Sequence, residues 1–281
     1  YLPPYVILTI PKGRFSEIGF LNERYSPLVT GGNPAAAKFI VDGIVPPGGL
    51  SREELSRRFE LLDRLDTFGK DDPAGHAEFK AFDAAGKEAR RTIEGDAAKV
   101  FDLSLESPEM RKRYGENTLG QSFLTARRLV EAGVPYITIN AQGWDTHKRH
   151  FETMKTKAAE MDRATTALLT DLHEKGLLDS TIIWWTGEFG RTPKIDWEAP
   201  WNGGRNHYSE CFSSLVAGGG FAGGKVVGVS DDKAEKVVSR PVAPQDMLGS
   251  IYELCGIDPD GPLPNPIGLK TTILPPESKA G

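Results

Sequence analysis

One short loop carries the residue types that most clearly indicate chemistry. Asp145 and His147 stand two positions apart in the segment 141–147, directly after an apolar run at residues 135–140. On an extended loop this spacing places both side chains on the same side. A carboxylate together with an imidazole suits a divalent metal such as zinc. The structural alternative is that Asp145 caps the helix that follows while His147 packs beside it.

A third convergent ligand would favour the metal over the helix cap. His207 is the best candidate, because it follows a Gly-Gly-Arg-Asn run just before another strand-like segment. His150 stands at the start of a predicted helix and is expected only to support the ligands. The residues therefore predict a metal site of Asp145, His147 and His207. The preferred ion is zinc, with calcium or manganese as alternatives.

A second loop, 187–193, follows the apolar run at residues 181–186 and contains Glu188 and Arg191. A carboxylate after a buried strand is costly unless it is paired or bound to a metal. A salt bridge from Glu188 to Arg191 is the structural alternative. The functional prediction is that Glu188 is a metal ligand or a general acid/base, and that Arg191 or Arg205 binds an anionic oxygen.

The elements that would position these loops alternate between helix and strand from about residue 117. Such alternation predicts an α/β fold with a mostly parallel sheet flanked by helices, whose continuous apolar strands are buried on both faces. Ligands bind beyond the carboxyl ends of the strands in such sheets, which is where both loops fall. The predicted helices are 117–133, 150–175 and 244–254, and the predicted strands are 135–140, 181–186, 212–217 and 225–229.

The first part of the chain has a different pattern. Residues 1–50 are extended and rich in turns, whereas residues 51–114 are charged, helical and poor in strand formers. Ser51 and Glu54 form a capping-box pattern at the start of that helical stretch. Its mixed charges are typical of a solvated helix face. We predict a single α/β domain over residues 1–281, with 51–114 as a helical layer or subdomain.

Composition narrows the classes of partner. The 281 residues contain 34 Lys and Arg against 39 Asp and Glu, a net charge of −5, which argues against nucleic acid as a partner. There is no run of about 18 apolar residues that could span a membrane. Residues 218–223 match G-x-G-x-x-G, but a strand-like run follows where a dinucleotide site needs a helix. Cys211 and Cys255 form no C-x-x-C motif, and their pairing stays open.

Seven segments carry a resemblance through their order along the chain. They are Tyr114–Gly133, Gly143–His147, Gly176–Thr181, Gly187–Pro193, Gly203–His207, Ala217–Gly220 and Arg240–Asp246. Together they resemble the bacterial domain-of-unknown-function family DUF1501. The resemblance covers most of the chain, and the combination of segments is more specific than any one of them. That family is similar to a distant branch of the alkaline phosphatase and sulfatase superfamily, so the resemblance implies an alkaline-phosphatase-like fold.

The resemblance implies a metal-dependent hydrolase of phosphate or sulfate esters, acting on an anionic small molecule or a glycan ester. In the superfamily one metal is held by an Asp and a His from one loop and by a later His. Asp145, His147 and His207 match those positions by their order. The second metal normally takes an Asp-His pair, and this chain has Glu188 and Phe189 there, so a carboxylate is kept and an imidazole is lost.

The resemblance also bears on location and on what precedes Tyr1. Family members usually begin with a twin-arginine-type export signal, and the superfamily nucleophile lies in the N-terminal part. The resemblance therefore implies that this chain is the C-terminal part of a longer periplasmic or secreted protein. Asn206 and Tyr208 stand where the family usually has Asp and Trp. These departures and Phe189 support a second hypothesis, a catalytically degenerate member that acts as an exported binding or assembly protein.

Overall fold

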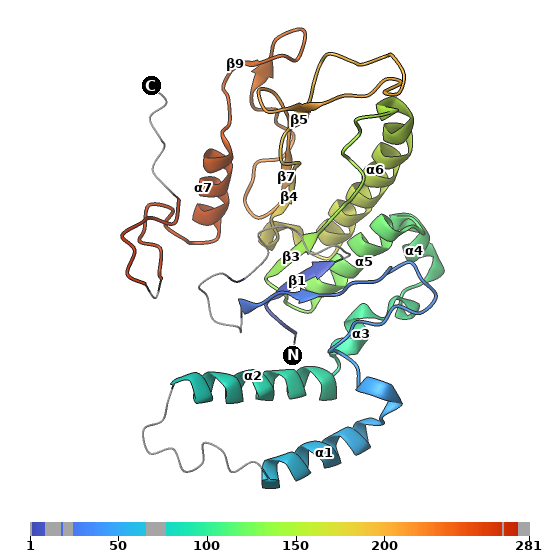
Figure 1. The fold of residues 1–281 in the computed structure, drawn as a ribbon, viewed down its shortest axis with the longest axis vertical. Coiled ribbons are helices and arrows are strands. Elements are labelled where there is room, and N and C mark those ends of the chain that lie inside the picture. Colours follow the sequence, from blue (N-terminus) through green and yellow to red (C-terminus); the bar gives the residue numbers. More distant parts are fainter. Residues whose placement is uncertain (1, 9–17, 19–24, 66–76, 266, 275–281) are drawn as a thin grey trace. The chain divides into compact units, whose positions relative to one another are not determined.

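The computed structural model of the chain describes residues 2–8, 18, 25–65, 77–265 and 267–274. The chain divides into two compact units, whose helices and strands are labelled in Figure 1. The first unit holds residues 1–141 and 163–168, and the second holds residues 142–162 and 169–281. The single domain predicted for residues 1–281 stays a prediction.

The first unit is built around a small parallel sheet. Strand β1 (Tyr5–Leu8) lies between β2 (Leu28–Val29) and β3 (Tyr136–Ile139), and both neighbours run parallel to it. Three residues of β1, from Val6 to Leu8, are fully buried. A central parallel strand is covered on both faces, which explains its unbroken apolar sequence. The strand predicted at 135–140 is confirmed as β3.

Helices make up most of the first unit, and they begin where the sequence offers caps. Ser51 Oγ accepts from the Glu54 amide at 3.1 Å and Glu54 Oε2 accepts from the Ser51 amide at 2.9 Å, which confirms the capping box. The helices are α1 (Arg52–Leu65), α2 (Ala77–Glu94), α3 (Ala97–Phe101), α4 (Pro108–Tyr114) and α5 (Thr118–Glu131), with 3₁₀ turns η2 (Pro47–Gly49) and η3 (Leu103–Leu105).

The core of the first unit joins these helices to the sheet. Phe101 of α3 and Leu129 of α5 pack in one buried cluster with Val6 and Leu8 of β1. By contrast, Leu62 and Leu65, which the helical spacing of α1 places on an apolar stripe, are 51 % and 70 % exposed. Leu55 is the buried residue of that helix. The charged stretch is therefore helical as predicted, but only part of its apolar stripe is covered.

The second unit contains the loops that carry the candidate site. Helix α6 (His150–Glu174) contributes residues to both units and ends before Gly176, which has a φ of +69° and stops the helix as predicted. Cys211 and Cys255 are both free thiols. The remaining elements are η4 (Leu178–Ser180), β4 (Ile183–Trp185), β5 (Gly190–Arg191), β6 (His207–Tyr208), β7 (Leu215–Ala217), β8 (Val229–Ser230), β9 (Val237–Ser239) and α7 (Pro244–Leu254).

The strands of the second unit pair antiparallel, which corrects the predicted sheet. Strand β4 pairs antiparallel with β7, as β5 does with β6 and β8 with β9. The prediction that residues 181–186 and 212–217 join a parallel sheet is therefore wrong. Trp184 and Trp185 of β4 are 38 % and 41 % exposed, so this strand is not covered on both faces as a parallel sheet requires.

The described residues thus form a mixed α/β structure with seven α-helices. Its sheets are one three-stranded parallel sheet and three two-stranded antiparallel sheets. Of the strand predicted at 225–229, only Val229 lies in β8, and Val226 is 92 % exposed. Among the helices of the described residues, none has the length and apolar character needed to cross a membrane.

Candidate metal centre

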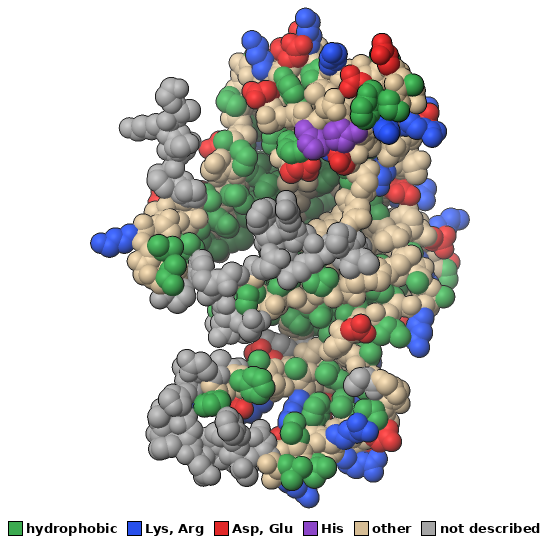
Figure 2. Space-filling view, in the orientation of Figure 1, with side chains coloured by type: hydrophobic (Ala, Val, Ile, Leu, Met, Phe, Trp, Pro, Cys, Tyr) green, Lys and Arg blue, Asp and Glu red, His purple; other side chains and the backbone are tan. Residues whose placement is uncertain are grey.

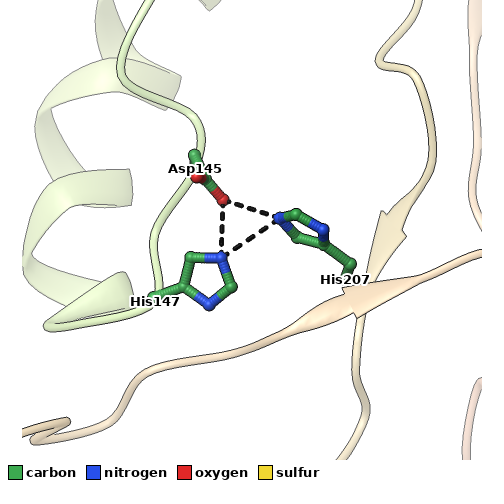
Figure 3. A group of neighbouring side chains, drawn as sticks. All are labelled: Asp145, His147 and His207. Carbon is green, nitrogen blue, oxygen red and sulfur yellow. Dashed lines mark hydrogen bonds and ion pairs between the residues drawn. The ribbon is translucent and has the colours of Figure 1, made fainter.

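Asp145, His147 and His207 meet at one point on the surface of the second unit. Histidine and acidic side chains lie next to each other there (Figure 2), and the close-up shows the three side chains pointing toward a common centre (Figure 3). Asp145 Oδ1 lies 2.9 Å from His147 Nε2 and 3.0 Å from His207 Nε2, and the two Nε2 atoms are 3.1 Å apart. The structure therefore brings together the three ligands that the sequence predicts.

Pairing of β5 with β6 delivers His207 and Arg191 to this point. The two residues are direct partners in the antiparallel register, so their side chains lie on the same face. Arg191 Nη1 donates to Asp145 Oδ1 at 2.7 Å. The 2-residue strands are short, yet they place a cation and an imidazole, 16 positions apart in the chain, beside the same carboxylate.

Gly204 holds the loop of His207 against the loop of His147. A Cβ atom at Gly204 would lie 1.9 Å from the backbone oxygen of His147, so a side chain at this position would clash with backbone. The next residue, Arg205, donates its amide to the Thr146 carbonyl at 3.2 Å. Glycine is required here because the two loops are in backbone contact, and this contact sets the distance between the two histidines.

Asp145 does not cap the helix that follows it. The N-cap of α6 is Arg149, in the left-handed conformation and without a side-chain cap. The Asp145 carboxylate instead interacts with His207 first and with Arg191 second, and both interactions lower its pKa below the ordinary value. The structural alternative raised by the Asp-x-His spacing is therefore wrong, and Asp145 is an ionised group held at the centre of the cluster.

A chain of side chains orients the His147 ring. The Asp196 carboxylate accepts a hydrogen bond from Asn206 Nδ2 at 2.9 Å, so Asn206 Oδ1 faces His147 and accepts from His147 Nδ1 at 2.9 Å. Neutral His147 then has its hydrogen on Nδ1 and a lone pair on Nε2. That lone pair points to Asp145 and His207. A hydrogen bond from the ring nitrogen that does not bind the metal is how proteins orient metal-binding histidines.

Counting protons shows that the three atoms cannot satisfy one another. Asp145 Oδ1 and His147 Nε2 carry no hydrogen, and a hydrogen on His207 Nε2 can serve only one of the three contacts. The 2.9 Å contact between Asp145 Oδ1 and His147 Nε2 then brings two lone pairs together. A divalent cation shared by the three atoms would take the place of the hydrogens and accept a lone pair from each of them. The donor set therefore fits a metal ion.

Glu188 and Arg205 lie outside this group of three. Glu188 has a side chain 66 % exposed, and its Oε1 is 3.7 Å from Arg191 Nη2. The segment is open to solvent, so the cost of burying this carboxylate does not arise, and the structure contains the Glu188–Arg191 ion pair that was the structural alternative. Arg205 Nε donates to the backbone oxygen of Thr192 at 2.6 Å. The predicted roles of both residues in catalysis stay predictions.

Thr146 and His150 lie next to the three candidate ligands and contact each other. Thr146 Oγ1 lies 2.6 Å from His150 Nδ1, and burial, followed by the charges of Arg205 and Arg191, lowers the pKa of His150. His150, hydrogen-bonded to the buried Thr146, is therefore a structural partner of the Asp145 loop. This arrangement matches the supporting role that the sequence indicates for it.

Sequence reasoning missed Asp196 and the part played by Asn206. Asp196 lies 10 positions before Asn206 in a loop with no recognisable motif, so its contact with the amide carries no signal in the spacing. Asn206 was distinguishable only as a departure from the family pattern. In the structure that departure has a use, because an amide can both donate to Asp196 and accept from His147.

Comparison with known proteins places the chain in a family of unknown function. Its chemistry therefore has to be inferred from the residues of the candidate site. The chain belongs to the DUF1501 family, described as proteins of unknown function, which it matches over residues 1–278. Comparisons with curated proteins and with solved structures give no match. The resemblance to DUF1501 is thereby confirmed.

Proposed function

We propose that the chain binds one divalent cation, with zinc preferred, at Asp145, His147 and His207. The observation that carries the proposal is the convergence of three ligand atoms spaced 2.9–3.1 Å apart. Atoms with this spacing leave a position about 2.1 Å from each of them, which is the bond length of zinc to nitrogen and oxygen ligands. Calcium and manganese are the alternative ions.

The reaction we propose is metal-dependent hydrolysis of a phosphate or sulfate ester. Three protein ligands leave a coordination position open for water or substrate, as in catalytic zinc sites. A cation there would polarise the ester oxygen or stabilise the leaving oxygen. Arg191, whose Nη1 is 2.7 Å from Asp145 and whose Nη2 is 3.7 Å from Glu188, stands beside the cluster and is proposed to bind an anionic oxygen. Glu188, within reach of Arg191, is proposed to hold a second metal or transfer a proton, with Arg205 as a further anion-binding group.

The resemblance to the alkaline phosphatase and sulfatase superfamily supports this reaction and brings three further proposals. They are an alkaline-phosphatase-like arrangement of the fold, a periplasmic or secreted location, and a nucleophile that is none of the residues named above. Each rests on the resemblance alone.

A second function, that of a catalytically degenerate member acting as an exported binding or assembly protein, is favoured by one observation. Phe189 occupies the position of the expected imidazole, and its ring centroid lies 4.4 Å from that of His207. An apolar ring there cannot hold a second metal. On this alternative the Arg191–Asp145 ion pair is structural, and the chain keeps the fold of the family without its reaction.

Metal analysis together with a hydrolysis assay separates these two functions. We expect the chain to bind one equivalent of zinc, and His147→Ala to weaken binding at least about a hundredfold. His173→Ala is the matched control, because His173 is an exposed histidine of α6 far along the chain from the cluster. Hydrolysis of p-nitrophenyl phosphate and p-nitrophenyl sulfate by the zinc-loaded chain is then measured.

The two measurements have distinct outcomes. If zinc, calcium and manganese all fail to bind, the metal proposal is wrong. If zinc binds with the expected ligand dependence and neither ester is hydrolysed, the binding or assembly function is favoured.

A further inference from the structure

The loop that carries Asp145 and His147 has no regular structure of its own. Residues 140–146 lie in neither helix nor strand, so contacts from other segments must hold them. The downstream end of the loop is fixed at Thr146, which is buried. The Arg205 amide donates to the Thr146 carbonyl at 3.2 Å, and Thr146 Oγ1 lies 2.6 Å from His150 Nδ1. Asp145 directly precedes this anchor, so the direction of its carboxylate depends on how the upstream part of the loop is held.

Lys157 of α6 contacts the upstream part of the loop at three consecutive residues. Its Nζ donates to the Gln142 carbonyl at 2.5 Å. Its Cε passes so close to Gly143 that a Cβ there would lie 2.7 Å from it. The same Nζ lies 5.8 Å from the ring centroid of Trp144, at a distance where a cation is attracted to an indole. One side chain therefore braces the three residues that lead to Asp145.

One face of α6 supplies both anchors of the loop. His150 and Lys157 are seven positions apart, or two turns along the helix, so they project from the same face. Lys157 is half-buried, whereas Lys155 is exposed. Trp144 also contacts Trp185 of β4, with 6.3 Å between the ring centroids, and this adds a second support. The ammonium of Lys157 is thus directed to the loop of Asp145, where a backbone carbonyl and an indole receive it.

We propose that Lys157 is a positioning residue of the metal centre, which holds residues 142–144 so that the Asp145 carboxylate faces the two histidines. This rests on the proposed metal site and adds the residue that places one of its ligands. A loop that becomes ordered only when the cation binds would lower the affinity by the cost of its ordering. A loop that Lys157 already holds presents Asp145 before the cation arrives, so the ligand set is preorganised.

The first measurement is the zinc affinity of variants of the 281-residue chain. Lys157→Met keeps the length of the side chain and removes its donors and charge, and we expect it to weaken zinc binding about tenfold or more. Lys157→Arg keeps donors and charge and should weaken binding less. Lys155→Met, at an exposed lysine of the same helix, is the matched control and should leave the affinity unchanged. Equal affinities of Lys157→Met and Lys155→Met would overturn the proposal.

A double-mutant cycle separates positioning from a general loss of structure. If Lys157 acts through Asp145, then Lys157→Met should weaken zinc binding in the unaltered chain and have little further effect in Asp145→Asn, which keeps both histidines. A merely structural contribution would weaken binding by the same factor in both backgrounds. Equal factors would therefore overturn the proposal.

The metal-free chain provides a test that does not depend on zinc. ¹⁵N relaxation of the EDTA-treated chain measures the order of the backbone amides of residues 142–145. We expect Lys157→Met to lower this order and Lys155→Met to leave it unchanged, with the other amide signals showing that both variants are folded. Unchanged order in Lys157→Met would overturn the proposal whether or not zinc binds. A failure of the unaltered chain to bind zinc would instead overturn the proposed metal site and leave the ordering result standing.

Discussion

Each unit contains a cluster in which one carboxylate is shared by several basic side chains. The two clusters differ in their hydrogen-bond chemistry. In the first unit Glu106 bridges Arg127 and Arg128, and its Oε2 lies 2.7 Å from Arg127 Nη2. The side chains of Arg127 and Glu106 are only 4 % and 12 % exposed. In the second unit Asp145 is the shared partner, and its side chain is 64 % exposed.

The difference lies in the match of donors to acceptors. In the Glu106 cluster each contact joins a guanidinium nitrogen, which carries hydrogen, to a carboxylate oxygen, which accepts it. In the Asp145 cluster Arg191 also donates to Asp145 Oδ1, but the three contacts among Asp145 Oδ1, His147 Nε2 and His207 Nε2 have too few hydrogens when both histidines are neutral. A matched cluster stabilises the fold by itself, whereas we propose that the mismatched one is completed by a bound cation. Ion pairs close in distance can thus have opposite roles.

The largest effect that tests this comparison is on stability. Glu106→Ala leaves two arginines without their shared carboxylate in a buried place, and we expect it to lower the free energy of unfolding by about 3–5 kcal/mol. Glu109→Ala, at an exposed glutamate of α4, is the control. Urea denaturation measures both. A loss for Glu106→Ala no greater than for Glu109→Ala would show that the first cluster is not structural.

Metal removal gives the next effect, in the second unit. Zinc at a hundred times its Kd should raise the free energy of unfolding by about 2.7 kcal/mol. Asp145→Asn should abolish that gain, and without zinc it should change stability by no more than about 0.5 kcal/mol because the site is exposed. Thermal denaturation with and without EDTA measures this. Equal stabilisation of both proteins by zinc would place the ion elsewhere.

A smaller effect concerns the relay from Asp196 to His147. Asp196→Ala frees the Asn206 amide to rotate, so His147 is no longer held with its lone pair toward the cluster, and zinc affinity should fall about 10–100-fold. Asp179→Ala, at an exposed aspartate of η4, is the control. Competition with a fluorescent zinc chelator measures the affinities. If the two variants bind zinc alike, the relay does not position His147.

The smallest expected effect is on acid stability. Burial alone would raise the pKa of Glu106, but hydrogen bonds from Arg127 and Arg128 outweigh it and hold the pKa below its ordinary value of 4.5. A carboxyl with a lowered folded-state pKa contributes stability above that ordinary value and loses it as the pH falls toward the folded-state pKa. Between about pH 5 and pH 3, Glu106→Gln should therefore lose less stability than the unaltered chain. Equal slopes in urea titrations across this range would contradict this.

Local rules predicted much of the fold and the centre of the site. The capping box of Ser51 and Glu54 and the helix stop at Gly176 depend on neighbours a few positions away, and both are present in the structure. The pairing of Asp145 with His147 depends on a two-residue spacing in the same way.

Properties that depend on distant partners escaped prediction. The apolar run at β4 looked like a buried parallel strand, yet it pairs antiparallel with β7 and leaves two tryptophans exposed. An apolar run has the same sequence whichever neighbour it meets, so neither the direction of pairing nor the covered face can be derived from it. The exposure of Glu188 could not be derived from the sequence for the same reason. Because its side chain is exposed, the argument from the cost of burying a carboxylate does not apply.

The sequence by itself determined which groups could bind a metal and which local elements present them, because ligand chemistry and helix boundaries depend on residue types at short spacing. Only the tertiary structure decided that three of these groups converge. It also decided that Asp196 orients His147 through Asn206, and that Trp144, next to Asp145, contacts Lys157 and Trp185. The physical reason is that hydrogen bonds and ring contacts act over a few ångströms between residues that lie tens of positions apart, and the chain must fold before those distances exist.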